Sequence, residues 1–519
     1  MAEHAIATPE RAATDAGVRA FAAGGNAIDA ALAAAATLTV TYPHNCGVGG
    51  DLIALVRRPS GSVVSVNASG IAGSGADAAA RHLSGGEMPV SGAITATVPG
   101  VVAGWEALHR MGASRPWRDV FIDAVRLAED GFAVPPSVAR AIAEAAPDID
   151  ADAGMRAVFR PGGVSLREGE RLRLPALAGT LRSLAADGPR AFYEGRIGRR
   201  LLAGLRPLGS LLAERDLAGF VPEVNGPLGR RFRDLEVLTS PPNSSGILLL
   251  QALAALDAAG AGLDPLGADA AFLVEVLRLG GLQRASSLAD PRHARVDTEA
   301  FLGDERIAEL VAAGSAARRG DPVSSGEVRA GGDTVAIVAA DASGRAVSLI
   351  QSLFHAFGAR VLEPDTGVVL HNRGAFFSLE PGHPNRLAAG KRPAHTLMPV
   401  MLQRDGQLAG VLGAMGGKAH AQIHAQVLLR LLGGASAQEA VSAPRCVVGS
   451  LELGEPDDTV RLEGGIPAAA RRSLEEAGMP TLDVPRHSED LGHVQAIWPA
   501  GAGLAAGSDP RADGAAAVI

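Results

Sequence analysis

Cysteine, lysine and aromatic residues are all scarce in this chain of 519 residues. The two cysteines, Cys46 and Cys446, provide neither a disulfide framework nor the thiolates of a structural zinc site. Lysine occurs only at Lys391 and Lys418 among 48 basic residues, and a GC-rich coding bias toward arginine accounts for this imbalance. Because aromatic residues make up 3% of the chain, the core must be built mainly from small aliphatic side chains.

Excess positive charge and long apolar runs are lacking as well. The net charge of -8 argues against a nucleic-acid-binding surface. The longest weakly charged apolar run, residues 27–40, contains Asp29 and is too short to span a bilayer. The first 17 residues have neither the basic nor the apolar region of a secretory signal. We therefore expect a soluble, cytoplasmic protein with neither a nucleic-acid partner nor a membrane partner.

The overall composition is typical of a globular protein, with 47% hydrophobic and 20% charged residues. Its length predicts two to four domains or one large α/β layer structure. Apolar periodicity and glycine or proline punctuation predict helices in several segments. These segments are residues 9–23, 27–38, 247–258 and 418–432, with further amphipathic helices within 101–150 and 175–220.

A glycine-rich loop, Gly47 to Asp51, precedes the apolar run 52–56, which predicts a buried strand. The loop resembles a phosphate-binding loop, but it lacks the Gly-Lys-Ser/Thr ending and the spaced glycines of a dinucleotide site. We interpret it as a structural turn close to a pocket. A second loop, Pro241 to Gly246, leads into the helix predicted at 247–258.

The character of the chain changes after residues 313–333, a polar, glycine-rich stretch that predicts a mobile connector. Thr334 then opens an apolar run, a turn follows at 341–344, and residues 346–352 are apolar again, which predicts a β-hairpin. A strand at 407–412 and a tight loop at 413–417 are expected further on. A flexible connector that ends directly before a threonine at the start of a buried strand calls for a chemical explanation.

A threonine hydroxyl becomes a useful nucleophile when the residue is N-terminal, because its own α-amine can take the proton. The chain would have to cleave itself between Asp333 and Thr334 to create that terminus. Oxyanions form during both cleavage and turnover, and backbone N–H groups must stabilise them. Gly416 and Gly417, before the predicted helix 418–432, are candidates because glycine permits close approach and helix N-termini present free N–H groups.

The order of the motifs resembles the γ-glutamyltransferase family of N-terminal nucleophile hydrolases over nearly the whole chain. The resembling stretches are GGNAIDAALAAAATLTVTYPHNCGVGGD (24–51), ATVPGVVAGWEAL (96–108), PWRDVFIDAVRLAEDGF (116–132), SPPNSSGILLLQAL (240–253), DTVAIVAADASGRAVSLIQS (333–352), GKRPAHTLMP (390–399), GAMGG (413–417), APR (443–445) and GSDPRADG (507–514).

This resemblance implies an α/β fold of the α+β type, a four-layer αββα sandwich made from a processed precursor. Residues 1–333 would form a large chain and residues 334–519 a small chain, the two together folding as one domain. The resemblance also implies Thr334 as the nucleophile and the N–H groups of Gly416 and Gly417 as the oxyanion hole. Ser352 falls where the family has a threonine that hydrogen-bonds to the nucleophile and activates it.

Several positions depart from the pattern of the γ-glutamyl enzymes. Ala68 replaces the arginine that pairs with the α-carboxylate of glutamate, while Phe376 and Arg373 replace the Asp and Gln that hold its α-amine. An asparagine of the same pocket becomes Phe354, and two serines become His395 and Thr396. Losing an acid and gaining an arginine changes the substrate charge that the pocket favours, which makes a γ-glutamyl group a poor candidate.

The replacements predict a pocket with an electropositive end and an apolar wall. Its candidate substrate-binding residues are Arg373, His395, Thr396, Asn372, Phe354 and Phe376, with His371 and Lys418 as further positive groups. An arginine suits bidentate binding of a carboxylate, so a small acyl group with its own carboxylate, such as oxalyl, fits this set.

In pattern the chain is similar to two branches of the family. One contains the oxamate amidohydrolases of purine breakdown. The other contains actinobacterial members that remove an oxalyl unit by C–C cleavage in the biosynthesis of lincomycin-type and pyrrolobenzodiazepine antibiotics, and the Ala- and Arg-rich composition favours it slightly. A C–C substrate would have to accept the carbanion charge itself, because the sequence shows no cofactor motif.

Two other functions remain open: a glutathione or γ-glutamyl hydrolase or transferase, and an unprocessed, non-catalytic binding protein. We expect no cofactor and no metal, since His420 and His424, although four residues apart, have no third ligand and fit a helix surface or a position behind the site better. His44 and His355 could be pocket groups but are more often structural, and Arg373 could be a simple surface or salt-bridge arginine. We expect Cys46 to be a small buried residue, and Arg445 and Arg511 to be ion-pair partners. The partners expected are a small-molecule substrate and the two chains of one precursor, with a homodimer of such pairs left open.

Overall fold

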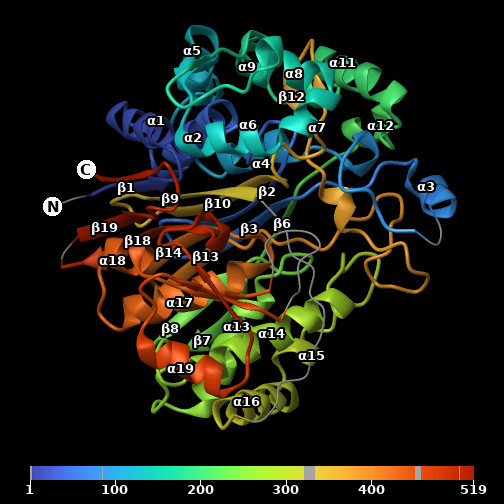
Figure 1. Ribbon diagram of the computed structural model, residues 1–519. Helices are drawn as coiled ribbons and strands as arrows, with labels where there is room; N and C mark the ends of the chain where they lie inside the picture. Colours follow the sequence, from blue (N-terminus) through green and yellow to red (C-terminus); the bar gives the residue numbers. More distant parts are fainter. Residues whose placement is uncertain (1–2, 84–85, 321–332, 450–457, 502) are drawn as a thin grey trace.

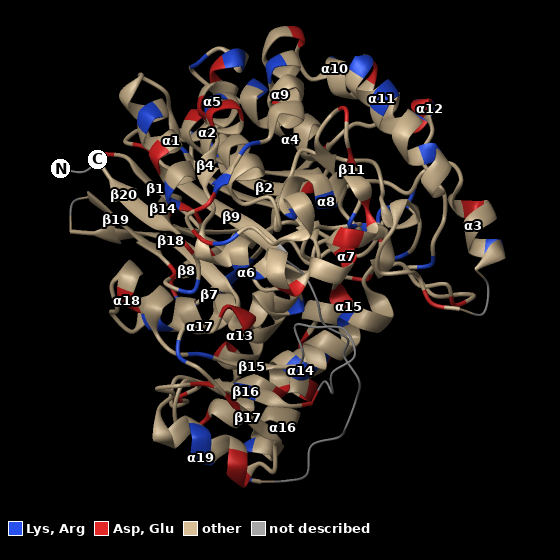
Figure 2. Cartoon of the chain, turned by 45° about the horizontal axis from the view of Figure 1, so that its top comes forward, with Lys and Arg blue, Asp and Glu red and all other residues tan. Residues whose placement is uncertain are grey.

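The computed structural model describes residues 3–83, 86–320, 333–449, 458–501 and 503–519. Two β-sheets pack face to face, and each is covered on its outer side by a layer of helices (Figure 1). This is the four-layer αββα sandwich that the sequence predicts. Charged residues gather on the outer helices and loops, whereas the central strands are almost free of them (Figure 2).

The first sheet has seven strands in the order β20-β1-β9-β10-β2-β3-β6. All its neighbours are antiparallel. Its strands are β1 (Ala5–Thr8), β2 (Asp51–Arg57), β3 (Val63–Ala68), β6 (Glu223–Asn225), β9 (Asp333–Ala340), β10 (Ala346–Phe354) and β20 (Ala515–Val518). Strands β9 and β10 form the predicted hairpin at the centre of this sheet.

The second sheet has six antiparallel strands in the order β19-β18-β14-β13-β8-β7. They are β7 (Leu228–Phe232), β8 (Leu235–Thr239), β13 (Val400–Arg404), β14 (Gln407–Met415), β18 (His493–Ala500) and β19 (Gly503–Ser508). Small and branched aliphatic residues fill the space between the sheets, among them Leu55, Val338 and Val411. Aliphatic side chains between two closely packed sheets thus form this part of the core without aromatic residues.

Helices α1 (Arg11–Ala22), α2 (Ala27–Thr41), α4 (Val101–Arg110) and α5 (Ile122–Asp130) cover the first sheet. Helix α2 is buried along its whole length because almost all of its side chains are apolar or small. The side chain of Asn26 caps its first turn, and Asp29 completes the capping box. The outer helices of this side are α6 (Pro136–Glu144), α7 (Ala146–Ala151), α8 (Ala153–Phe159), α9 (Pro175–Asp187), α10 (Arg190–Tyr193), α11 (Arg196–Leu205) and α12 (Glu214–Ala218).

The second sheet is covered by α13 (Ile247–Ala259), α14 (Ala270–Ser287), α16 (Asp304–Arg318) and α17 (His420–Leu432). Smaller elements complete the fold. They are α3 (Ala76–His82), α15 (Glu299–Leu302), α18 (Ala437–Ser442), α19 (Ala468–Glu476), β4 (Phe132–Ala133), β5 (Arg171–Leu172), β11 (Leu362–Glu363), β12 (Val368–Val369), β15 (Cys446–Val448), β16 (Val460–Glu463) and β17 (Thr481–Val484).

Two sequence expectations need correction. The connector predicted from residue 313 begins too early, because α16 continues through alanines to Arg318, and residues 321–332 lie outside the described part of the chain. The loop predicted at 413–417 is shorter, because β14 continues to Met415 through its pairing with β18. No helix in the described part of the chain combines the length and apolar character that a membrane span requires.

Candidate active site

Thr334, Ser352 and Asp51 stand in one row across three neighbouring strands of the first sheet. The Thr334 hydroxyl donates a hydrogen bond to Ser352 Oγ at 3.1 Å, and Ser352 lies opposite Asp51 in the β10–β2 register. A bulge between Gln351 and Phe354 shifts the β9–β10 register at this point, and bulges commonly re-aim side chains beside functional sites. All three residues of the row are buried. The threonine predicted as nucleophile therefore lies beside the hydroxyl predicted to activate it.

Asp51 is the centre of a buried group of charged and polar side chains. Its Oδ2 accepts a hydrogen bond from His395 Nε2 at 2.9 Å and lies 3.2 Å from His371 Nδ1, and its Oδ1 accepts from the Gly70 N–H. Burial alone would raise the pKa of Asp51, but the charge and hydrogen bonds of His371 and His395 lower that pKa below its ordinary value. Asp51 is therefore a carboxylate at neutral pH.

Arg373 lies next to this carboxylate on a short 3-10 turn, Arg373–Phe376. Its Nε is 3.9 Å from Asp51 Oδ2, and its Nη1 donates to Thr396 Oγ1 at 3.4 Å. Burial lowers the pKa of Arg373 to about 9, against the opposing effect of Asp51, so the guanidinium stays charged at neutral pH. Only 1% of the residue is exposed, yet Nε and Nη2 have no hydrogen-bond partner among the described residues.

Two phenylalanines form an aromatic wall beside Arg373. The guanidinium carbon lies 3.8 Å from the centroid of the Phe354 ring, and Phe354 meets Phe376 edge-on at 5.6 Å. Phe354 has a positive φ of 84°, which is strained for a residue with a bulky side chain. The backbone N–H of Phe354 donates to Ser352 Oγ at 2.8 Å. The strained turn therefore connects the aromatic wall to the hydroxyl groups of Ser352 and Thr334.

Gly416 and Gly417 lie between β14 and α17. Both have positive φ angles, 154° and 51°, and a Cβ on Gly416 would come within 2.3 Å of Ile423. Within the described ranges, neither backbone N–H donates to another backbone carbonyl. The two residues thus have the backbone conformation and the available N–H groups that an oxyanion hole needs, and their role in one stays a prediction.

Two predicted substrate-binding residues are occupied by contacts within the protein. His395 Nδ1 accepts from the Leu397 N–H at 3.2 Å, so the proton shared with Asp51 lies on Nε2 and both ring nitrogens have partners. The Asn372 side chain donates to Val90 O and to His355 Nδ1 and accepts from the His355 N–H. The geometry makes these residues supports of the pocket wall.

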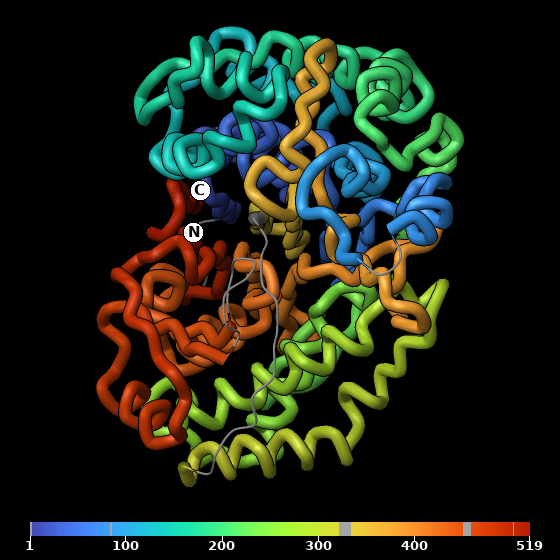
Figure 3. Tube along the Cα trace, turned by 45° about the vertical axis from the view of Figure 1, so that its right-hand side comes forward, coloured from blue at the N-terminus to red at the C-terminus, as the bar shows by residue number. Residues whose placement is uncertain are grey.

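The pairing of segments far apart in the sequence builds this wall. The segment containing residues 355–395 lies beside residues 68–95, as the orange and blue tubes of Figure 3 show. Ala72 exchanges backbone hydrogen bonds with Lys391 and Gly390, and Asn372 reaches Val90 across the same boundary. Ala68, at the end of β3, is fully buried and presents no charge.

His420 and His424 are both buried in α17, which corrects the expectation of a helix surface. His420 Nδ1 lies 2.7 Å from Thr396 O and therefore sits behind the Arg373 pocket. Among the described residues, no group of three or more histidine, cysteine or acidic side chains is arranged to hold a metal ion.

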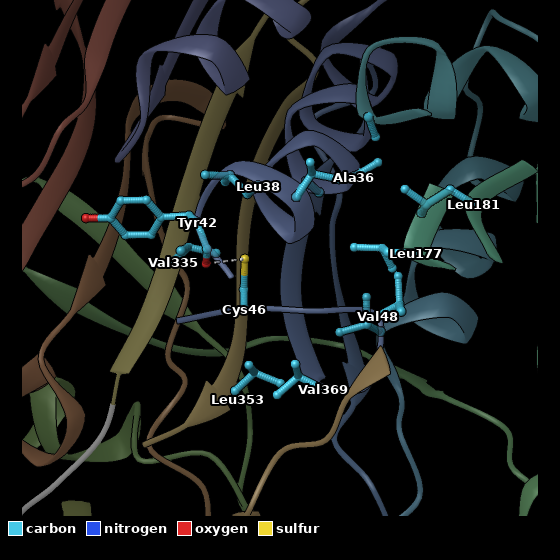
Figure 4. Close-up of a cluster of buried hydrophobic side chains, with 14 of the residues drawn as sticks. Ala36, Leu38, Tyr42, Cys46, Val48, Leu177, Leu181, Val335, Leu353 and Val369 are labelled. Atoms are coloured by element: carbon cyan, nitrogen blue, oxygen red, sulfur yellow. Dashed lines mark hydrogen bonds between the residues drawn. The ribbon is translucent and has the colours of Figure 1, made fainter. Parts of the chain in front are cut away.

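The structural roles predicted for three other residues are confirmed. Arg445 and Arg511 are buried and both form ion pairs with Asp509. Cys46 is fully buried among aliphatic side chains with its sulfur toward Tyr42 O (Figure 4). Burial raises the pKa of this thiol, so it is not a reactive thiolate.

Asp51 is the main residue that sequence reasoning missed. It closes the glycine-rich loop 47–51, where the sequence indicates only a turn. Its partner His395 is 344 residues away, so no local pattern connects the two. The available signal is an acidic residue at the start of the buried strand β2, directly before the apolar run 52–56.

Comparison with known proteins places the fold in a class and then in a family. A solved cephalosporin acylase from Bacillus halodurans superposes with a TM-score of 0.89 at 32% identity, covering 99% of this chain and 96% of that one. The sandwich, with a threonine at the start of a central strand, defines an N-terminal nucleophile hydrolase fold. The γ-glutamyltranspeptidase family model matches residues 13–519, and the chain belongs to that family.

Curated relatives agree with this assignment. The oxamate amidohydrolase proenzyme of Klebsiella pneumoniae is 36% identical, covering 100% of this chain and 99% of its own length. The glutathione hydrolase-like YwrD proenzyme of Bacillus subtilis is 34% identical over 99% of this chain and 98% of its own length. The protein is therefore a hydrolase of the γ-glutamyltranspeptidase family, and both of these relatives are named as proenzymes.

Proposed function

We propose that this protein cleaves itself between Asp333 and Thr334 and then hydrolyses donors of a short acyl group that carries its own carboxylate, such as oxalyl. One observation carries the choice of acyl group. Arg373 is buried and charged. Its Nε and Nη2 form one edge of the guanidinium group and make no hydrogen bond among the described residues, and Nε lies 3.9 Å from Asp51 Oδ2. Two parallel donors on one edge match the two oxygens of a carboxylate.

The contacts of Arg373 connect it to the predicted nucleophile. The Arg373 guanidinium stacks on the Phe354 ring, and the Phe354 N–H donates to Ser352 Oγ. Ser352 Oγ also accepts from the Thr334 hydroxyl. An acyl group that carries its own carboxylate can therefore contact both Arg373 and Thr334.

In the proposed reaction, the free α-amine of Thr334 takes the proton of the Thr334 hydroxyl as Oγ1 attacks the substrate carbonyl. The N–H groups of Gly416 and Gly417 stabilise the oxyanion, and Ser352 holds the attacking hydroxyl in place. The bond to the leaving group breaks, and the leaving group takes the proton. Water, deprotonated by the same amine, then hydrolyses the ester and restores Thr334.

A substrate of the C–C type would follow the same path with a carbon leaving group. The relative named as an oxamate amidohydrolase supports the amide form, in which the leaving group is an amine. An antibiotic-biosynthetic role and the C–C form rest on the sequence pattern alone.

The test is a comparison of two substrates with the purified, self-cleaved enzyme. Oxamate should release oxalate, whereas γ-glutamyl-p-nitroanilide should release p-nitroaniline at least 100-fold less efficiently in kcat/KM. Efficient release of p-nitroaniline without any oxalate formation would overturn the proposed acyl group and favour the γ-glutamyl alternative.

A further inference from the structure

Beside the aromatic wall lies a pocket of about 490 Å³. We propose that it binds the leaving group of the substrate, and that this leaving group is a mainly apolar fragment the size of a six-membered ring. The proposal rests on the function proposed above and specifies the other half of the substrate. It distinguishes this protein from an enzyme whose leaving group is ammonia.

Two residues that line the pocket adjoin predicted catalytic residues in the chain. Phe354 lines it and follows the hydroxyl-bearing Ser352 by two residues, while its ring also lies against Arg373. On the other side, Lys418 lines it and directly follows Gly417. Phe376 closes the wall between them, 5.6 Å from Phe354 and 5.9 Å from Lys418 Nζ. A substrate with its carboxylate at Arg373 and its carbonyl at Thr334 would therefore extend its remaining part into this pocket.

The pocket is far too large for ammonia. A small molecule such as water occupies about 30 Å³, whereas pockets of about 300 to 1,000 Å³ typically hold organic ligands. An enzyme that releases only ammonia has no need of a space of about 490 Å³ beside Phe354 and Lys418. The volume instead suits a ring with substituents, whose binding energy can help position the reacting carbonyl.

The lining indicates an uncharged, largely apolar guest. Just over half of the residues around the pocket are apolar, among them Leu288, Phe354, Phe376 and Phe377. Its charged side chains are of both signs, Glu87 and Glu380 opposing Arg284 and Lys418, so no net charge is selected. Aromatic rings such as Phe354 and Phe376 favour flat partners through stacked or edge-on contacts.

His355 lines the pocket together with the polar residues Ser378 and Asn385. Its Nδ1 faces the Asn372 amide, its Nε2 has no hydrogen-bond partner among the described residues, and burial lowers its pKa to about 3. The ring therefore stays uncharged at neutral pH, with its proton on Nε2. It therefore adds no charge to the pocket wall.

For an amide substrate the step is balanced without any further reactant. The Thr334 Oγ1–acyl bond forms as the C–N bond breaks, and the hydroxyl proton passes through the α-amine to the leaving nitrogen. A ring-bearing amine is then released from the pocket, and water converts the oxalyl ester to oxalate.

The experiment compares oxamate with N-phenyloxamate on enzyme whose self-cleavage has been verified by mass spectrometry. Oxalate release from N-phenyloxamate should have a kcat/KM at least 10-fold higher than release from oxamate. If oxamate is hydrolysed as well as or better than N-phenyloxamate, the leaving-group proposal is wrong while the proposed function stands. If neither compound releases oxalate, the proposed acyl group itself is wrong, and this inference falls with it.

A variant that fills the pocket tests whether the preference for N-phenyloxamate over oxamate arises there. Ala285 is an exposed residue of α14 on the pocket wall, so an Ala285→Trp substitution places an indole at the pocket without altering the core. It should reduce the preference for N-phenyloxamate over oxamate at least 5-fold. The matched control, Ala312→Trp, changes an exposed alanine of α16 that does not line the pocket, and should keep the wild-type preference. An unchanged preference in Ala285→Trp would place the phenyl group elsewhere.

Discussion

At the scale of single residues, the candidate site contains two buried groups of opposite charge, the Asp51 carboxylate and the Arg373 guanidinium. Asp51 is ionised and accepts hydrogen bonds from His395 and Gly70, and Arg373 Nε lies 3.9 Å from its Oδ2. Arg373 Nε and Nη2 make no hydrogen bond among the described residues. A buried arginine with unsatisfied donors is costly unless a ligand meets them. The Asp51 carboxylate favours the charged form of Arg373, and we expect the substrate carboxylate to accept from the unsatisfied donors.

An Arg373→Gln substitution should raise KM strongly for oxamate and lower kcat/KM about 100-fold, because charged hydrogen bonds of about 1.5 to 3 kcal/mol are lost. Self-cleavage should persist, since it needs no substrate carboxylate. Oxalate release and denaturing mass spectrometry measure the two effects separately. The control, Arg404→Gln, removes an arginine of β13 that pairs with Asp234 at the surface, and should match the wild type. An unaltered KM in Arg373→Gln would remove Arg373 from the binding site.

The sequence could predict that Thr334 and Ser352 lie side by side, but not that Asp51 and His395 lie next to them. Thr334 and Ser352 belong to one hairpin, whose two apolar runs and turn residues are readable locally. Asp51 and His395 meet only because β2 pairs with β10 and because the segment after residue 390 folds back onto the first sheet. Contacts between residues so far apart in the sequence follow from the whole fold. They cannot be predicted from the periodicity of a short segment.

At the scale of elements, the turn from β14 into α17 positions the two predicted oxyanion donors. The helix and the strand were both predictable from apolar periodicity, with an error of three residues at the end of the strand. The sharp turn between them depends on Gly416 and Gly417, whose positive φ angles other residues adopt only with strain. The chemistry thus depends on backbone conformation more than on side chains.

A Gly417→Ala substitution should slow self-cleavage and lower kcat together, each by about 10-fold or more, because a displaced N–H loses much of its stabilisation of the oxyanion. A time course of fragment formation and a turnover assay measure the two rates. Gly434→Ala is the matched control, since Gly434 also has a positive φ, 94°, at the far end of α17 and has open space around it. Equal rates in Gly417→Ala and Gly434→Ala would contradict an oxyanion role for this turn.

At the scale of the whole molecule, the proposed cut would leave both sheets shared between the two chains. The first sheet would contain β1, β2, β3 and β6 from the large chain and β9, β10 and β20 from the small chain. The second sheet would combine β7 and β8 with four strands of the small chain. Because both cores are continuous across this division, the chains should stay together after cleavage and separate only on unfolding.

The stability of the molecule should also depend on pH, because the fold buries many histidines in the neutral form. Burial lowers the pKa of His44, His355, His420 and His424 to about 3, and that of His395 and His493 to about 4. Unfolded histidines titrate near pH 6.5, so between about pH 6.5 and pH 4 the unfolded chain binds more protons than the folded chain. The free energy of unfolding should therefore fall as the pH drops through this window.

The measurement uses Thr334→Ala, which is expected to remain a single chain, with urea midpoints at pH 7, 6 and 5. Each histidine contributes a slope of up to about 1.4 kcal/mol per pH unit. Adding His424→Gln should flatten the dependence, whereas the control His82→Gln, at an exposed residue of α3, should not change it. Identical midpoints at the three pH values would contradict the neutral burial of these side chains.

The central claim is that Thr334 becomes an N-terminal nucleophile, and mass spectrometry of the purified protein tests it most directly. Under denaturing conditions the wild type should give two masses, those of residues 1–333 and 334–519, while native conditions keep the pair together. Thr334→Ala should give one intact mass and no hydrolysis of oxamate. A wild-type protein that stays intact while it hydrolyses oxamate, or one that is cut at another bond, would contradict the account.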